Sequence, residues 1–146
     1  MYDEQSFYRA FEKDLYSARE SVIIESPFIT LRRIEELLPA VTKLRRRGVL
    51  VTVNTRNPIE HDEEYEMQAL VAIEKLQELD AKVLCTVKYH RKLAIIDGMV
   101  AWHGSLNILS QNGSCEIMWR VALKGIADQL LEFIKLTKYI GREYTL

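Results

Sequence analysis

Three short runs of β-branched and apolar residues, separated by amphipathic stretches of helical length, constrain the fold of this 146-residue chain most strongly. The runs are Ser21–Ser26, Val49–Thr55 and Ala81–Val87. Connections of this length allow crossovers that make neighbouring strands parallel, with helices packed on the sheet. Helices are predicted for residues 4–19 behind the N-cap Asp3, for the segment from Ile34 to Leu44, and for the segment that Asp62 opens.

The second predicted helix contains Pro39, which should kink or restart it. Arg45, Arg46 and Arg47 suit the negative end of its dipole, and Gly48 suits the position just after its last turn. The helix is therefore expected to end at the glycine.

The last third of the chain departs from this alternation. Tyr89–Ile96 and Met99–His103 flank Asp97-Gly98, a dipeptide typical of a two-residue β-hairpin. Cys115–Val121 predicts a further strand, and residues 126–139 predict a closing helix. We therefore expect an α/β fold, a three-layer α-β-α sandwich with a mixed, largely parallel central sheet.

Length, charge and cysteine content indicate a single-domain protein without a strong overall charge. The length suits a single domain over residues 1–146, and a net charge of −1 argues against the non-specific DNA adhesion of a strongly basic chain while allowing a local basic surface. Cys85 and Cys115 lie in apolar settings without metal-type spacing, which predicts reduced core residues of a cytoplasmic protein. The acidic N-terminus and the short apolar runs predict neither export nor membrane insertion.

Polar residues at both ends of the predicted hairpin indicate an anion pocket. Alternate side chains of a strand share a face, so His90 and Lys92 are expected to point the same way, and the hairpin returns Ser105 and Asn107 to the same place. Phosphate suits this set best, because the ammonium neutralises one oxygen while the hydroxyl and carboxamide donate to others. The imidazole can then act as a nucleophile toward phosphorus or as a general acid, and neither role needs a metal.

The spacing of these residues resembles the HxK(x)4D(x)6GSxN signature of the phospholipase D superfamily. It reads His90-x-Lys92, four residues, Asp97, six residues, Gly104-Ser105-x-Asn107. The segments "IIESPFIT" and "RRRGVLVTVNT" resemble those that precede the motif in bacterial nucleases of the superfamily and in nuclease-like domains fused to DNA helicases. Glu116 resembles the acidic residue that hydrogen-bonds a catalytic histidine in this superfamily.

The resemblance implies a homodimer. The superfamily's active site contains two motifs related by two-fold symmetry, this chain holds one, and single-motif members place one active site across the dimer axis. The implied mechanism is metal-independent: His90 of one chain attacks the phosphodiester, while His90 of the other chain protonates the leaving oxygen and then activates water. No cofactor is implied.

The remaining motif residues take supporting roles in the implied mechanism. Lys92 and Asn107 would hold the non-bridging oxygens, Ser105 would add a hydrogen bond, and Glu116 would fix a histidine tautomer. Asp97 and Gly104 are assigned to local structure.

Three functions remain open for this site. A nuclease acting on DNA rather than RNA is the first hypothesis, because the chain lacks the amphipathic lipid-facing segments of a membrane-acting phospholipase. The alternatives are a non-catalytic nucleic-acid-binding domain that serves a helicase or restriction partner, and a phospholipid phosphodiesterase. Arg32 and Arg33 are candidate nucleic-acid contacts, since they follow a loop at a strand end, where ligands bind in open α/β sheets.

Other polar and aromatic residues have ordinary structural explanations. The segment Glu60–Glu66 is interpreted as an N-cap with glutamates in the first helical turn, and not as a metal site. His103 fills no motif position and is assigned to the rim or to structure. Trp102 and Trp119 are expected in the core, and base stacking is considered only for one that is exposed.

Overall fold

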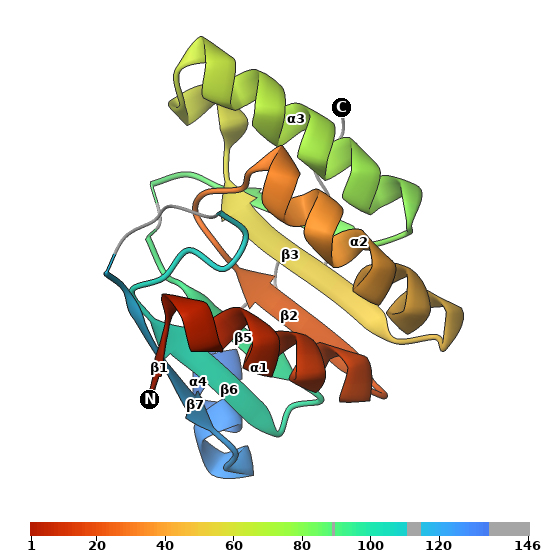
Figure 1. The fold of residues 1–146 in the computed structure, drawn as a ribbon, viewed down its shortest axis with the longest axis vertical. Helices are drawn as coiled ribbons and strands as arrows, with labels where there is room; N and C mark the ends of the chain where they lie inside the picture. Colours follow the sequence, from red (N-terminus) through yellow and green to blue (C-terminus); the bar gives the residue numbers. More distant parts are fainter. Residues whose placement is uncertain (89, 111–114, 135–146) are drawn as a thin grey trace.

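In the described part of the chain, a mixed sheet of seven strands is covered by three helices on one face and by one on the other (Figure 1). The computed structural model describes residues 1–88, 90–110 and 115–134. In chain order the elements are β1 (Tyr2–Asp3), α1 (Glu4–Ser17), β2 (Ser21–Glu25), α2 (Leu31–Arg46), β3 (Leu50–Arg56), a 3-10 turn (Pro58–Glu60), α3 (Glu63–Glu78), β4 (Lys82–Thr86), β5 (Leu93–Ile96), β6 (Val100–Gly104), β7 (Ile117–Val121) and α4 (Lys124–Ile134).

The strand order is β1-β7-β6-β5-β2-β3-β4. Among the described strands, β2 pairs in parallel with β3 and β3 with β4, whereas the other four pairings are antiparallel. The predicted mixed α-β-α architecture is therefore confirmed. Five strands do point the same way, but most pairings are antiparallel, because β5 and β7 run in reverse between them.

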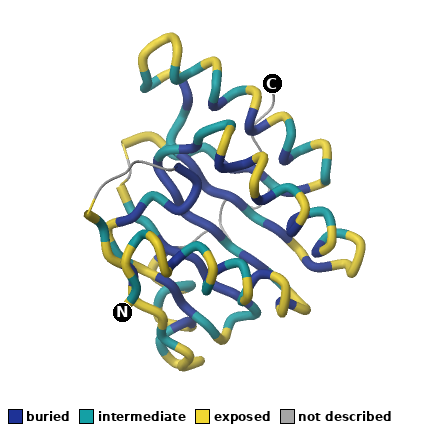
Figure 2. The backbone as a smooth tube through the Cα atoms, viewed as in Figure 1, coloured by how far each residue is buried: buried dark blue, intermediate teal, exposed yellow. Residues whose placement is uncertain are grey.

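Alternation along the strands fills two cores. Val22 and Ile24 of β2 face the large cluster beneath α1, α2 and α3, while Ile23 faces the smaller cluster beneath α4. In β5, Ala94 belongs to the first cluster and Ile95 to the second. The buried stretches follow the central strands and the exposed ones the outer helix turns (Figure 2), as expected for strands covered on both faces.

The helices begin at the caps that the sequence predicts. The Asp3 carboxylate accepts a hydrogen bond from the Ser6 backbone at 2.9 Å, and the Asp62 carboxylate accepts one from the Tyr65 backbone at 2.9 Å. The expected restart at Pro39 is wrong, because α2 continues through the proline as one helix whose buried face includes Leu37. Packing of that face outweighs the hydrogen bond that the proline removes.

The hairpin differs from the prediction at its start and at its turn. β5 begins at Leu93; His90 and Lys92 precede it, and Tyr89 lies outside the described residues. Three residues separate the paired ends Ile96 and Val100. The late start follows from the strand order, because β5 pairs with β2 on the side away from β3 and β4. After β4 the chain must pass the ends of β3 and β2 before it can form β5.

Two further predictions extend into segments that are not described. The predicted closing helix is present as α4 from Lys124 to Ile134, and its expected continuation to residue 139 lies outside the described residues. The loop before β7 includes residues 111–114, which are also outside them.

Asp97 fastens the hairpin turn to the start of β2. Its carboxylate accepts hydrogen bonds from the backbone N–H groups of Arg19, Glu20 and Ser21 at 2.8 to 3.1 Å. Partial burial raises the pKa of this carboxyl, but the hydrogen bonds from Glu20, Ser21 and Arg19 outweigh burial and lower the pKa below its usual range. Asp97 also has a φ of 55°, a left-handed conformation that Asp and Asn adopt more readily than other non-glycine residues.

The first prediction concerns this anchor. Asp97→Ala should lower the free energy of unfolding by about 2 kcal/mol at pH 7, because three N–H groups lose a charged acceptor and alanine disfavours this φ. Asp97→Asn, which tolerates the backbone and keeps one acceptor oxygen, should lose less. Urea unfolding at both pH 7 and pH 3 measures the effect.

The pH dependence has a definite sign. Because the pKa of Asp97 is lowered in the folded state, its carboxylate stabilises the fold at pH values above the unfolded-state pKa of about 4. That stabilisation is lost as the pH falls through the lower pKa of the folded state. The difference between wild type and Asp97→Asn should therefore shrink at pH 3. Equal stability of wild type and Asp97→Ala at pH 7 would contradict the assignment.

Candidate functional site

The candidate residues gather at the sheet edge where the parallel strands end. Leu93, the first residue of β5, pairs with Glu25 at the end of β2 and with His103 near the end of β6. The segments that precede β5, follow β6 and precede β7 therefore all emerge at this edge. It is the carboxyl edge of β2, β3 and β4, where ligands bind in open α/β sheets.

His90 and Lys92 lie on the segment that leads into β5. His90 is exposed and Lys92 is half-buried. The Lys92 ammonium donates to the His90 carbonyl at 3.0 Å, and the Gly104 N–H donates to the Lys92 carbonyl at 3.3 Å. Lys92 is therefore bonded to the first residue of the GSxN segment. The expectation that strand alternation points His90 and Lys92 the same way is wrong, because both residues precede β5.

Gly104 leaves no room for a side chain between β6 and β7. A Cβ atom here would clash with the Ile117 carbonyl oxygen and lie 3.0 Å from the Met118 Cα, so a side chain would force the strands apart. The next residue, Ser105, closes the connection: its N–H donates to the Ile117 carbonyl at 3.0 Å, and its hydroxyl accepts from the Ile117 N–H at 3.1 Å. Ser105 is exposed at the edge.

Asn107 carries an unsatisfied polar atom. Its Oδ1 is buried, and no hydrogen-bond partner is found for it within the described part of the chain. A buried amide oxygen without a partner is unfavourable, and such atoms commonly mark places where a ligand or solvent completes the bonding. Rotation of the carboxamide exchanges its oxygen and nitrogen, so the same position can offer N–H donors to an anion.

The loop between β2 and α2 holds the backbone that follows Asn107. The buried Ser26 hydroxyl accepts from the Leu109 N–H at 3.2 Å and donates to the Phe28 carbonyl at 2.8 Å. The Thr30 N–H donates to the Leu109 carbonyl at 2.8 Å. The "SPFIT" segment, which the sequence places in a loop at a strand end, therefore supports the backbone after Asn107.

Arg33 belongs to the same support and does not contact solvent. It is 1% exposed; its Nε donates to the Ile108 carbonyl at 3.2 Å, and its guanidinium lies 3.8 Å from the centre of the Tyr8 ring. Burial raises the pKa of the Tyr8 phenol to about 12, against the opposing charge of Arg33. The prediction that Arg33 contacts nucleic acid is wrong, because it shares the buried face of α2 with Ile34. Arg32 is exposed and pairs loosely with Glu36 at 3.6 Å, so its proposed contact stays a prediction.

A buried polar chain, which sequence reasoning missed, crosses the ends of the three parallel strands. Thr86 donates to the Asn54 amide oxygen at 2.8 Å, and the Asn54 amide nitrogen donates to Glu25 at 2.5 Å. Arg91 donates to both Glu25 oxygens, at 2.9 and 3.2 Å. The available sequence signal was a polar residue near the end of each apolar strand.

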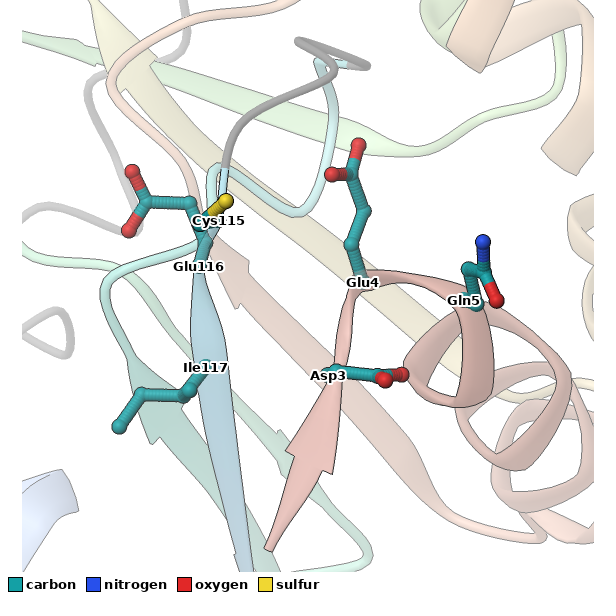
Figure 3. A pocket seen from close by; sticks show the side chains of 6 residues that line it. All are labelled: Asp3, Glu4, Gln5, Cys115, Glu116 and Ile117. Carbon is teal, nitrogen blue, oxygen red and sulfur yellow. The ribbon is translucent and has the colours of Figure 1, made fainter.

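Glu116 lines a pocket between the start of β7 and the start of α1 (Figure 3). The pocket measures about 370 Å³ and is lined by Asp3, Glu4, Gln5, Cys115, Glu116 and Ile117. The side chains of Cys115 and Glu116 point to opposite sides of the chain. Within the described residues no hydrogen bond joins Glu116 to His90, although strand order brings both to the same edge. Cys115 is exposed, which corrects the expectation of a core cysteine, because it precedes β7 at the rim.

One tryptophan is exposed against expectation. Trp102 is fully buried, as predicted, but Trp119 is 46% exposed, and Ile117, two residues earlier on β7, is exposed as well. The smaller core beneath α4 contains residues of β2, β4 and β5, whereas Ile117 and Trp119 are exposed on β7.

The acidic segment before α3 has the expected structural role. Asp62 caps the helix, and Glu60 pairs with Arg56 at 2.8 Å and accepts from the Lys88 N–H at 2.9 Å. Among residues 1–88, 90–110 and 115–134, no group of three potential metal ligands is found. No helix in those ranges is long and apolar enough to cross a membrane.

His103 is exposed on β6, opposite Trp119.

The sheet order and the motif at its edge define a phospholipase D-like α/β protein. A family model described as "Cardiolipin synthase, PLD-like domain" matches residues 11–136, so the chain belongs to this phospholipase D-like family. Comparison with curated proteins finds no significant match.

Solved structures share the fold at low sequence identity. Nuc from Salmonella typhimurium, a phospholipase D family member, is 17% identical with a TM-score of 0.77 over 98% of this chain and 93% of that one. NucT from Helicobacter pylori is 18% identical with a TM-score of 0.68 over 92% and 91%. TrmBL2, an archaeal chromatin protein with a novel mode of DNA binding, is 12% identical with a TM-score of 0.60 over 94% of this chain and half of that one.

The second prediction concerns the support of the GSxN segment. Ser26→Ala removes the acceptor for the buried Leu109 N–H and should lower the free energy of unfolding by about 1 to 3 kcal/mol. Ser17→Ala is the matched control, since that hydroxyl also donates to a backbone carbonyl but is exposed, and it should change stability by less than about 0.5 kcal/mol. Chemical denaturation of both variants measures the difference, and equal effects would contradict the role given to Ser26.

Proposed function

We propose that this protein is a phosphodiesterase that cleaves nucleic acid through a phosphohistidine on His90. One observation carries the proposal: the residues of a phosphate pocket, His90, Lys92, Ser105 and Asn107, lie on segments that meet at the carboxyl edge of the parallel strands. The buried Asn107 Oδ1, which has no hydrogen-bond partner within the described residues, supports the proposal, because rotation of the carboxamide would turn its N–H groups toward an anion at that position.

The proposed reaction has two displacements on phosphorus. The neutral His90 imidazole attacks the phosphodiester, a P–N bond forms as the P–O bond to the leaving strand breaks, and His90 of the partner subunit gives its proton to the leaving oxygen. The partner's His90 then takes a proton from water, whose oxygen attacks phosphorus and breaks the P–N bond. The second step regenerates both imidazoles and releases a phosphomonoester.

The other motif residues would stabilise charge on the phosphoryl oxygens. Lys92 would release the His90 carbonyl and turn its ammonium to a non-bridging oxygen, while Asn107 and Ser105 donate hydrogen bonds. Glu116 would orient a histidine from its place beside the start of β7. No metal or cofactor enters this reaction.

A homodimer completes the proposed site, because one motif supplies one histidine and the reaction uses two. The exposed Ile117 and Trp119 on β7 support this assembly, since they form an apolar surface next to Ser105. A two-fold axis beside this strand would bring the two copies of the edge together.

Nucleic acid is the proposed substrate, and DNA is preferred over RNA. TrmBL2, which shares the fold, binds DNA, and the exposed Arg32 offers a cation for a polynucleotide backbone. The description of the matching family model names cardiolipin synthase, so a phospholipid is the second candidate substrate. A domain that binds nucleic acid for a helicase without cleaving it is the third.

The third prediction tests the chemistry. Wild type should hydrolyse single- or double-stranded DNA or a generic phosphodiester in the presence of a chelator, and His90→Ala should lower kcat by at least about 1,000-fold, because it removes the nucleophile. His103→Ala, an exposed histidine outside the motif, is the control and should keep activity. Phosphatidylcholine vesicles and RNA are the competing substrates.

The outcomes separate the candidate functions. Turnover of vesicles alone would favour the phospholipid substrate, and tight DNA binding without turnover would favour the accessory domain. If wild type cleaves none of these substrates, or if His90→Ala remains fully active, the proposed chemistry is refuted.

The fourth prediction tests the assembly. Trp119→Glu places a charge on the proposed apolar surface and should shift the protein from dimer to monomer in sedimentation analysis, with loss of hydrolysis. Leu50→Glu is the control, because Leu50 is an exposed apolar residue at the opposite end of the sheet and should leave the dimer intact. A wild-type monomer that remains fully active would contradict the shared site.

A further inference from the structure

We infer that Glu25 is a positioning residue that acts through Arg91 to hold the His90–Lys92 segment in its reactive position. This role rests on the proposed function, because the position of the segment is reactive only if His90 attacks phosphorus. It concerns the buried polar chain at the strand ends, which no step of the proposed chemistry uses.

The contact between Glu25 and Arg91 is two-pronged and anchored in the sheet. The Arg91 Nε donates to one Glu25 oxygen at 2.9 Å and its Nη2 to the other at 3.2 Å. Glu25 is 0% exposed at the end of β2, the strand between β5 and β3. Such a fork fixes the plane of the guanidinium as well as its distance.

The carboxylate is itself held in place from behind. Asn54, 1% exposed, donates its amide N–H to Glu25 at 2.5 Å, and its amide oxygen accepts from the Thr86 hydroxyl at 2.8 Å. Glu25 and Thr86 are the last residues of β2 and β4, and Asn54 lies on β3 between these strands, so the carboxylate is fixed by neighbouring strands. Arg91 thus receives a rigid acceptor.

The position of Arg91 explains why this anchor matters. Residues 87, 88 and 90–92 lie between β4 and β5 and belong to no strand, and the chain passes the ends of β3 and β2 between those two strands. The backbone of this segment is tied at Lys88 to Glu60 and at Lys92 to Gly104. Between these two points, Arg91 binds the buried Glu25 and so holds the segment against the sheet. Its guanidinium carbon also lies 5.9 Å from the centre of the Phe133 ring. The neighbouring residue, His90, is exposed.

Core stability alone does not account for a buried carboxylate here. Removing a charge from water is unfavourable, and an apolar pair of similar volume commonly serves a core as well as an ion pair does. An ion pair provides a defined direction and distance, which a catalytic segment needs. Small displacements of a reacting group reduce rates strongly even when the mutation lies outside the chemistry.

The effect should therefore appear in kcat. Arg91→Ala and Glu25→Gln should each lower kcat by about 10- to 100-fold while KM changes less than about 3-fold, because the pocket residues remain but His90 is less well aligned. Arg91→Lys keeps the charge without the fork and should recover part of kcat. The two substitutions combined should cost no more than the larger one, since both break the same contact.

The matched control is a second two-pronged pair. Arg120 donates to Asp14 at 2.7 and 2.9 Å, and its side chain is 33% exposed against 37% for Arg91. Arg120→Ala should lower thermal stability by a similar amount as Arg91→Ala and leave kcat nearly unchanged. Stability loss alone would then be excluded as the cause.

A second readout does not depend on turnover. Hydrogen exchange measured by mass spectrometry on a peptide covering residues 87–93 should speed up in Arg91→Ala and Glu25→Gln, and remain as in wild type in Arg120→Ala. If wild type has no phosphodiesterase activity, the proposed function fails while this comparison still decides the positioning role. Unchanged exchange in both variants, or full kcat in Glu25→Gln, would overturn the inference.

Discussion

Two adjacent polar residues at the carboxyl end of β2 hold the two halves of the motif, and the arrangement of the site depends on them. Glu25 binds Arg91, between His90 and Lys92, and Ser26 binds the backbone at Leu109, just after the GSxN segment. β2 is also where the sheet changes character, since it is parallel to β3 and antiparallel to β5. The motif thus assembles at the junction of the two halves of the sheet, where a strand end is free to face a ligand.

The spacing of the motif follows from the hairpin. The four residues between Lys92 and Asp97 are the whole of β5, and the six residues between Asp97 and Gly104 are the turn and all but the last residue of β6. Asp97 fixes the far end of this hairpin to the start of β2, and Gly104 allows β7 to pack against the near end. Two motif residues without a chemical role therefore set the register that brings the others together.

Local signals in the sequence predicted most of the secondary structure. Caps such as Asp3 and Asp62 are determined by contacts within one helical turn, so the helix starts could be predicted. The start of β5 could not, because it depends on how many strands the chain must cross, which is a property of the strand order. Pro39 failed as a breaker for a related reason, since tertiary packing outweighs a local preference.

The parts of the site that sequence reasoning missed are its supports. Arg33 and Glu25 carry charge, and charged residues are normally exposed, so burial of both required partners from distant segments that no local pattern reveals. The apolar strand pattern predicts a core position for Trp119, whereas the side chain is 46% exposed on β7. Its exposure supports the proposal that a second chain covers this surface.

Mixing of subunits tests most directly the central claim that two copies of this edge form one phosphodiesterase site. Wild type and His90→Ala are mixed in varied ratios, allowed to exchange subunits, and assayed for DNA hydrolysis. If both histidines are needed, only dimers of two wild-type chains are active, so activity at constant total protein falls with the square of the wild-type fraction, to about a quarter in an equal mixture. A linear fall, to about half, would mean that each chain acts alone and would contradict the account.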